Sequence, residues 1–254
     1  MKANTHFNIY RLFQLLSREF KMNRKWIGIA IAAIAGALFA ILVTDSYIRG
    51  YINYEPLVSS FYIFFFLGGF IYTSRIFGEL HQPEKSYQYL TLPASTLEKL
   101  VSQWLISSVG FVLVSYILLF LVSLLGALTA SALFDIPFEL LNVQKLLFSQ
   151  NTGIYMVFQS IFFLGACYFR NYNFIKTLLA LFIVGFAINL IVSGLLYVIF
   201  GQSILTESNF WMQLNELPLF VETEFPQLIR AVVGYGIAPF FLVVSYFTLK
   251  GRQV

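Results

Sequence analysis

Residues 75–100 carry side chains whose types and spacing suit hydrogen bonding and ion pairing. This stretch holds both signs of charge, one of the two histidines and two of the seven prolines in the 254-residue chain. Pro93 disfavours a helical conformation at the residue before it. Ser95 and Glu98 then fit the capping-box pattern S-x-x-E, in which each side chain accepts the other residue's backbone N–H. We therefore predict that a helix begins just after Ser95.

The part of this segment before Pro93 has more apolar side chains than a simple turn between helices needs. We predict that the preceding helix continues for a turn or two beyond residue 75, breaks near Pro83 and is followed by a short helix around residues 84–90. Two interpretations remain open. The segment either only connects two helices or is a docking element for a soluble partner.

Outside residues 75–100, the sequence contains few side chains of the types that carry out catalysis or bind metals. No apolar run contains Asp, Glu, Lys, Arg or His, the residues on which ion-coupled transporters, proton pumps and intramembrane aspartyl proteases depend. The single cysteine, Cys167, rules out an intramolecular disulfide, and His6 and His81 add too little for a metal site. A GxxxxGK[ST] phosphate-binding signature is also missing. We expect no catalytic residue, cofactor, metal or nucleic-acid partner, and no enzymatic activity.

Mild polar residues and glycines remain within the apolar runs. Gln159 and Asn189 are the largest of the polar ones, and we favour hydrogen bonds between helices as their role, although a path for an amphiphilic substrate would use the same residue types. Gly68, Gly69, Gly185 and Gly194 are interpreted first as packing contacts and second as hinges.

The composition is that of a membrane protein, because 59% of residues are hydrophobic and only 11% are charged, against about a quarter charged in soluble domains. We predict an all-α integral membrane protein with a single transmembrane domain over residues 1–254 and six transmembrane helices. The apolar runs that predict these spans, each close to the length needed to cross a bilayer, lie at about 26–43, 57–74, 101–127, 153–169, 177–200 and 231–249.

The distribution of basic residues predicts the orientation. With both termini inside (N-in/C-in), the cytoplasmic segments hold 13 of the 16 Lys and Arg residues, and only Arg49, Lys145 and Arg230 lie outside. This asymmetry agrees with the positive-inside rule.

The third apolar run is longer than one crossing, because Val101–Phe134 contains 34 residues without a charge. As a helix it would extend about 51 Å, against a hydrocarbon core of about 30 Å. We expect the chain to leave the membrane near Gly126 and the SALFDIPF segment, residues 131–138, and we expect residues 138–148 to form a short interfacial helix on the outer side.

Two segments outside the spans have amphipathic patterns. Residues 5–25 place Ile9, Leu12 and Phe20 on one helical face and basic residues on the other, which predicts an N-terminal amphipathic helix in the membrane interface. The acidic segment 201–228, broken near Pro218 and Pro226, is predicted to form short helices on the outer side.

The order of these features resembles the ABC-2 type permeases. FGELHQPEKSYQYLTLPASTLEKLVSQWL is similar to the stretch of small bacterial permeases in which an acidic residue precedes an "LP.S..EK" element at the start of the third span. RNYNFIKT, residues 170–177, is similar to their short second inner loop. The resemblance covers the whole chain in the order of its elements, and some 30 residues in amino-acid sequence.

The resemblance implies a permease subunit, an exporter in a bacterial inner membrane, whose energy comes from a separate ATP-binding cassette subunit. A second permease chain, identical or different, would complete a dimer within the lipid bilayer. Secondary contacts would come from Arg11, Arg18, Arg170 and Lys176. The implied ATPase-docking residues are Glu79, His81, Glu84, Lys85, Tyr87, Leu92, Pro93, Ser95, Glu98 and Lys99.

The alternative is a membrane scaffold or regulatory protein of the same fold that transports nothing. Uncharged spans fit both hypotheses, and substrate-stimulated ATP hydrolysis would separate them. Lipid-like compounds, peptides, polysaccharides and drugs all remain open as substrates.

Overall fold

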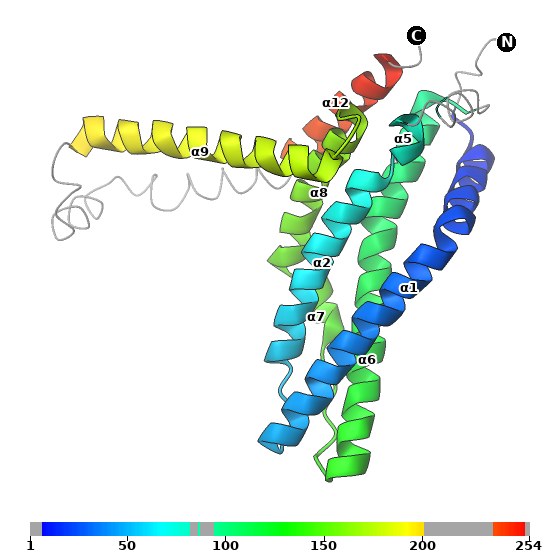
Figure 1. The fold of residues 1–254 in the computed structure, drawn as a ribbon, viewed down its shortest axis with the longest axis vertical. Coiled ribbons are helices and arrows are strands. Elements are labelled where there is room, and N and C mark those ends of the chain that lie inside the picture. Colours follow the sequence, from blue (N-terminus) through cyan, green and yellow to red (C-terminus); the bar gives the residue numbers. More distant parts are fainter. Residues whose placement is uncertain (1–6, 82–85, 87–93, 201–235, 252–254) are drawn as a thin grey trace.

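The computed structural model describes residues 7–81, 86, 94–200 and 236–251, and the secondary structure within these ranges is all helical (Figure 1). The helices are α1 (Ile9–Arg49), α2 (Glu55–Arg75), α3 (Gly78–His81), α5 (Thr96–Leu105), the π-helix η1 (Ile106–Gly110), α6 (Phe111–Phe134), α7 (Val143–Leu147), α8 (Gln150–Tyr168), α9 (Asn173–Phe200) and α12 (Ala238–Gly251).

The long helices form an elongated bundle in which consecutive helices run in alternating directions. Figure 1 shows α1, α2 and the continuous α5–η1–α6 along the bundle, with α8 packed against α2 and α12. The start of α1, the end of α2, the start of α5 and the end of α12 all lie at one end. We call this the polar end, and the end with Arg49, Glu55 and Phe134 the opposite end.

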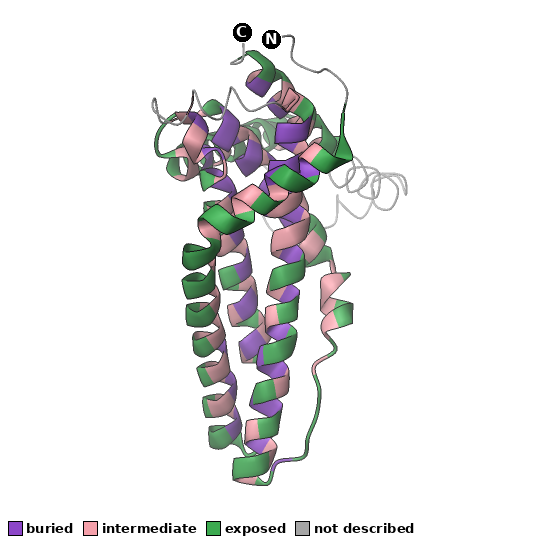
Figure 2. Ribbon diagram, turned by 90° about the vertical axis from the view of Figure 1, so that its right-hand side faces the viewer, coloured by how far each residue is buried: buried purple, intermediate pink, exposed green. Residues whose placement is uncertain are grey.

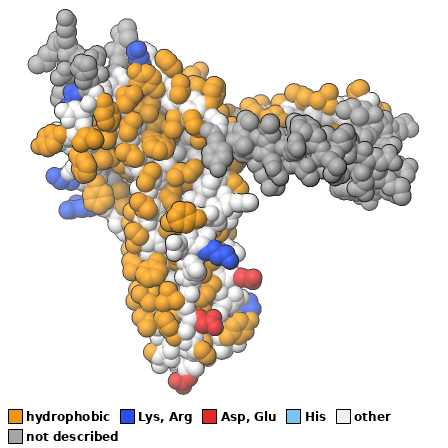
Figure 3. All heavy atoms as spheres, turned by 180° about the vertical axis from the view of Figure 1, so that it is seen from behind, with side chains coloured by type: hydrophobic (Ala, Val, Ile, Leu, Met, Phe, Trp, Pro, Cys, Tyr) orange, Lys and Arg blue, Asp and Glu red, His pale blue; other side chains and the backbone are white. Residues whose placement is uncertain are grey.

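Four helical segments are long and apolar enough to cross a membrane: Ile9–Arg49, Glu55–Arg75, Thr96–Phe134 and Asn173–Val198. They indicate a membrane protein. Hydrophobic side chains are spread along the bundle in Figure 3, and the carboxylates visible there lie toward the opposite end. Of the two other predicted spans, α8 is a 19-residue helix that contains several polar residues, and α12 is shorter. The six-span, N-in/C-in topology stays a prediction.

The first helix corrects the expected boundary at residue 25. α1 is a single helix of 41 residues, with the Asn8 side chain accepting the Tyr10 N–H at its start and Gly50 in the left-handed conformation at its end. No break separates residues 9–25 from the apolar run that follows. Figure 2 shows, however, that the N-terminal part of α1 is inclined to the rest.

The third apolar run differs from expectation in part. The helix does not leave the bundle at Gly126, which packs against Leu42, but continues to Phe134, within the expected segment 131–138, and ends where Asp135 adopts a left-handed conformation. Instead of the expected helix over residues 138–148, only α7, five residues long, is helical. The predicted outer segment 201–228 lies outside the described residues.

Aromatic rings fill the middle of the bundle. Tyr155 of α8 is fully buried, lies 4.4 Å from Phe65 between ring centroids and is stacked on Phe70. Gly69 makes this packing possible, since a Cβ there would come within 2.5 Å of the Tyr155 ring and 2.8 Å of Phe111. Gly69 therefore has the predicted packing role, whereas a Cβ at Gly185 or Gly194 would meet no atom of the described residues within 4 Å.

Helix α9 is as apolar as the bundle helices, but among the described residues it contacts the bundle at its start. Gly165 of α8 closely approaches Thr177, and Figure 1 shows the rest of α9 projecting sideways from the bundle. None of the residues in its most apolar window is buried. Asn189, one of the two predicted intramembrane polar contacts, is exposed on α9.

Candidate functional site at the polar end

The predicted capping box is present at the start of α5. The Glu98 backbone N–H donates to Ser95 Oγ (3.2 Å), and the Ser95 backbone N–H donates to Glu98 Oε2 (2.7 Å). Ser95 itself has the extended backbone of an N-cap residue. The entry into the third long apolar segment is therefore fixed by local hydrogen bonds.

The same carboxylate also holds the start of α1. Glu98 Oε1 accepts the backbone N–H of Asn8 (2.6 Å) and pairs with Nη2 of Arg11 (3.0 Å). Because Asn8 caps α1 and Ser95 caps α5, one buried carboxylate lies at the N-termini of two helices, whose dipoles favour negative charge there. Glu98, fully buried, thus joins two helices that start 87 residues apart in sequence.

A second set of polar contacts lies about two turns further along α1. Arg18 pairs with Glu79 (2.9 Å) and with its neighbour Glu19 (3.2 Å), and Gln103 Nε2 donates to Glu19 Oε1 (2.9 Å). Burial raises the pKa of the Glu19 carboxyl, while the Gln103 hydrogen bond opposes that shift. Helices α1, α3 and α5 are therefore joined by polar side chains at two levels.

These contacts change the roles expected for several docking residues. Glu98 and Lys99 are buried, so their side chains offer no surface to a partner, and the docking assignment for these two is corrected to an internal one. Burial also lowers the pKa of the Lys99 ammonium. Arg11 and Arg18, expected to face lipid headgroups or a partner, form ion pairs within the chain.

The remaining docking residues fall into two groups. Glu79, His81 and Ser95 are partly exposed at the polar end, and His81 Nε2 donates to the backbone carbonyl of Ala166 (2.8 Å). The others lie outside the described residues: Glu84, Lys85, Tyr87, Leu92 and Pro93.

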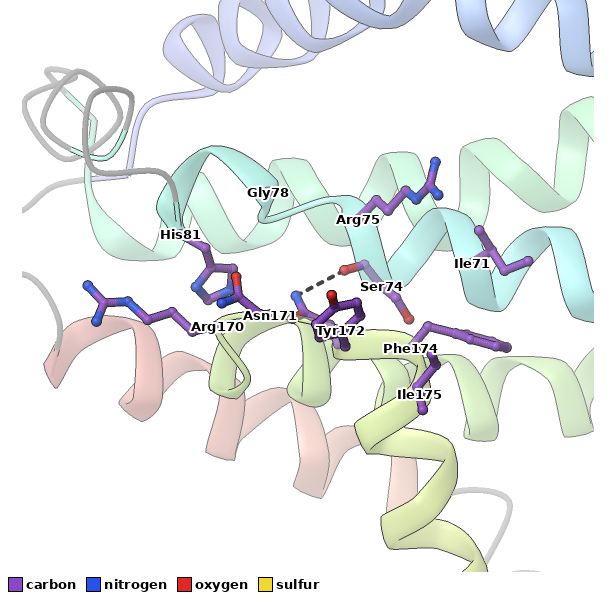
Figure 4. Close-up of a pocket in the computed structure, with 11 residues that line it drawn as sticks. Ile71, Ser74, Arg75, Gly78, His81, Arg170, Asn171, Tyr172, Phe174 and Ile175 are labelled. Carbon is purple, nitrogen blue, oxygen red and sulfur yellow. Dashed lines mark hydrogen bonds between the residues drawn. The ribbon is translucent and has the colours of Figure 1, made fainter.

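The loop between α8 and α9 lies at the same end. Asn173 Nδ2 donates to the backbone carbonyl of Ser74 (3.3 Å), which ties the start of α9 to the end of α2. Lys176 lies over the Phe169 ring, 5.9 Å from its centroid, and Arg170 is exposed. Both predicted secondary contacts are thus accessible, beside a cavity of about 630 Å³ (Figure 4).

No sequence pattern indicated the π-helix η1, which lies at the point where α5 passes into α6. The wider turn is supported from α8, since the Tyr155 hydroxyl donates to the Ser107 carbonyl (3.3 Å) and Gln159 Nε2 donates to Ser107 Oγ (2.9 Å). Gln159 therefore makes the predicted hydrogen bond between helices. Single π-turns are frequent at functional sites, and η1 borders an apolar groove of about 620 Å³ between α1, α2 and α6.

Models of known protein families, curated proteins and solved structures give no match to this chain. The polar end is therefore interpreted from its own geometry. Among the described residues, no group of three or more His, Cys, Asp or Glu side chains could hold a metal ion. What the site does provide is a set of contacts between helix ends, which suits transmission of movement from one helix to another.

Proposed function

We propose that this chain is the permease subunit of a bacterial ATP-driven exporter of the ABC-2 type. It would work in the plasma membrane with a separate ATP-binding cassette subunit and with a second permease chain, identical or different. Hydrolysis of ATP belongs to the partner, and the segment between α3 and α5 is the docking element.

The observation that carries the proposal is the position of Glu98. Glu98 completes the capping box of α5, the helix that follows the proposed docking segment. It also binds Asn8, the N-cap residue of α1, and Arg11 of the same helix. A displacement of the segment before Ser95 is therefore passed to α1 and, through α5, to α6. This is the mechanical connection that a transporter driven from outside the membrane needs.

Co-purification tests the docking assignment. The chain is expressed with the ATP-binding cassette protein encoded beside it, and Glu84, Lys85 and Leu92 are replaced together by alanine. The matched control replaces Glu139, Lys145 and Leu140, which are the same residue types and are exposed away from the polar end (Figure 1). We expect the first variant to lose the ATPase while still inserting into membranes, and the control to keep it. Normal association in the first variant would contradict the docking assignment.

A second measurement separates the exporter from the scaffold hypothesis. In reconstituted vesicles, the complex is assayed for ATP hydrolysis with lipids, peptides and drugs added in turn. An exporter is expected to hydrolyse ATP faster with its substrate, whereas a flat response together with stable ATPase association favours a scaffold.

A further inference from the structure

The cavity at the start of α9 has the chemistry of an anion site. It lies between the end of α2, α3, the α8–α9 loop and the first turn of α9, and Arg75 and Arg170 are among its lining residues. No carboxylate lines it among the residues that the structure describes. Within the same residues the ion pairs use Arg11, Arg18 and Arg49, so neither lining arginine has an acidic partner there.

The two arginines can approach a ligand from both sides. Figure 4 shows Arg170 beside His81 and Asn171, and Arg75 above Ser74, with the two guanidinium groups extending away from each other. Both side chains are exposed, and each can turn toward the cavity without breaking an ion pair within the described chain. Guanidinium groups bind phosphate oxygens in a bidentate manner, which favours a phosphate over a simple halide.

The cavity is polar at one end and apolar at the other. Arg170, His81 and Asn171 lie at its polar side, while Ile71, Phe174 and Ile175 lie toward the apolar length of α2 (Figure 4). The cavity therefore matches a molecule with a phosphate at one end and a hydrocarbon chain at the other. Basic pockets between transmembrane helices near the membrane surface bind lipid headgroups in this way.

We propose that this cavity binds the phosphate headgroup of an anionic phospholipid, with an acyl chain lying along Ile71 and Ile175. The buried Oδ1 of Asn173 has no partner within the described chain and would accept a headgroup hydroxyl. Phosphatidylglycerol carries both phosphate and hydroxyl groups and is the probe of choice. Lipid binding here requires neither an ATPase nor transport, so it can fail independently of the proposed function.

Native mass spectrometry of the full chain, taken from nanodiscs of phosphatidylcholine and phosphatidylglycerol, measures the lipid retained. The test variant replaces Arg75 and Arg170 with glutamine. The control replaces Arg24 and Lys25 with glutamine. These two exposed cations lie on α1 and do not line the cavity, and both variants lose two positive charges. Each lost charged hydrogen bond weakens binding by roughly tenfold or more, so the test variant is expected to lose its phosphatidylglycerol preference and the control to keep most of it.

Three results would overturn the proposal. Equal losses in both variants would show a diffuse basic surface, and equal retention of the two lipids by the wild-type chain would show no anion site. Displacement of bound phosphatidylglycerol by inorganic phosphate or glycerophosphate, neither of which has an acyl chain, would assign the cavity to a soluble phosphate compound. Unchanged melting temperatures of both variants would confirm that misfolding does not cause the loss of bound phosphatidylglycerol.

Discussion

At the polar end, the fully buried Glu98 binds groups of two different helices, whereas at the opposite end Asp45 and Arg49 pair within one turn of α1, where the Arg49 side chain is 43% exposed. The opposite end is joined across elements by a neutral contact instead, in which the Tyr54 hydroxyl donates to the Glu139 carbonyl (2.6 Å). The two ends contain similar residue types. They differ in whether a charge links separate elements or stays within one.

This difference indicates which end moves as a unit. Buried ion pairs are costly to break because the remaining charge is left without a partner, while exposed pairs contribute little. A force applied near Ser95 should therefore displace α1 and α5 together, whereas the end near Arg49 has no comparable connection through charge among the described residues. Four substitutions test this contrast.

Replacing Glu98 with alanine should have the largest effect. It removes the acceptor for the N–H groups of Asn8 and Ser95 and leaves Arg11 without this carboxylate. Loss of one partner of a buried pair costs about 3 kcal/mol, which corresponds to a fall in melting temperature of roughly 6–12 °C for a chain of this size. Thermal unfolding in detergent measures the change.

A double-mutant cycle with Arg11→Gln and Glu98→Gln is the control for this prediction. Glutamine keeps one acceptor oxygen for the backbone N–H groups of Asn8 and Ser95, and the loss of the second oxygen is common to the single and the double variant, so the cycle isolates the interaction between the two side chains. We expect the two substitutions to be non-additive. Additive effects would mean that the two helices are not joined through this pair.

The capping box could be predicted from sequence because all its information lies within four residues, Ser95 to Glu98, following Pro93. The long apolar helices were predictable for a similar reason, since the length of each run fixes the length of the helix. The contact between Glu98 and Arg11 could not be predicted, because any of the basic residues of the N-terminal segment would have satisfied the amphipathic pattern. Only the packing of α1 on α5 selects Arg11.

The π-helix shows the same limit within the apolar region. Residues 106–110 have no unusual pattern, and their geometry is supported by Tyr155 and Gln159, which are 48 and 52 residues from their partner Ser107. The end of α6 at Phe134 lies within the segment 131–138, which the sequence had indicated. Gly126 does not mark a helix end, because it admits Leu42 of α1 instead.

Substitutions at two adjacent glycines test whether tight packing in the middle of the bundle holds its two ends in a fixed relative position. Gly69→Ala places a methyl group against Tyr155 and Phe111, and such overpacking costs about 1–3 kcal/mol. Gly68→Ala is the matched control, because its nearest neighbour is the Phe111 ring at 4.0 Å. It should be neutral, or stabilising by up to about 1 kcal/mol, since alanine favours helix. Similar melting temperatures for both variants would contradict the packing role of Gly69.

The pH dependence of stability should report the burial of Glu19. Its pKa in the folded chain is raised above the ordinary value of 4.5, mainly by burial. The folded chain therefore binds this proton more tightly, so the contribution of Glu19 to stability is greatest at acidic pH and declines as the pH rises through the raised pKa.

The variant Glu19→Gln removes this titration and keeps an oxygen that accepts from Gln103. Its melting temperature relative to the wild type should therefore rise between acidic and neutral pH. The effect should be smaller than that of Gly69→Ala, because Gln103 and Arg18 offset part of the burial cost. A relative melting temperature that falls over the same range would show that the ion pair with Arg18 outweighs burial.

The smallest effect is expected at the opposite end, from Asp45→Asn. The pair with Arg49 lies within one helical turn and is exposed on the arginine side, where water competes for the guanidinium and salt screens the attraction. Asparagine also keeps an oxygen that can accept from Arg49. The melting temperature should be unchanged within error at both low and high salt, in contrast to Glu98→Ala. A loss as large as that of Glu98→Ala would mean that charge holds both ends of the bundle equally, and that the polar end has no special mechanical role.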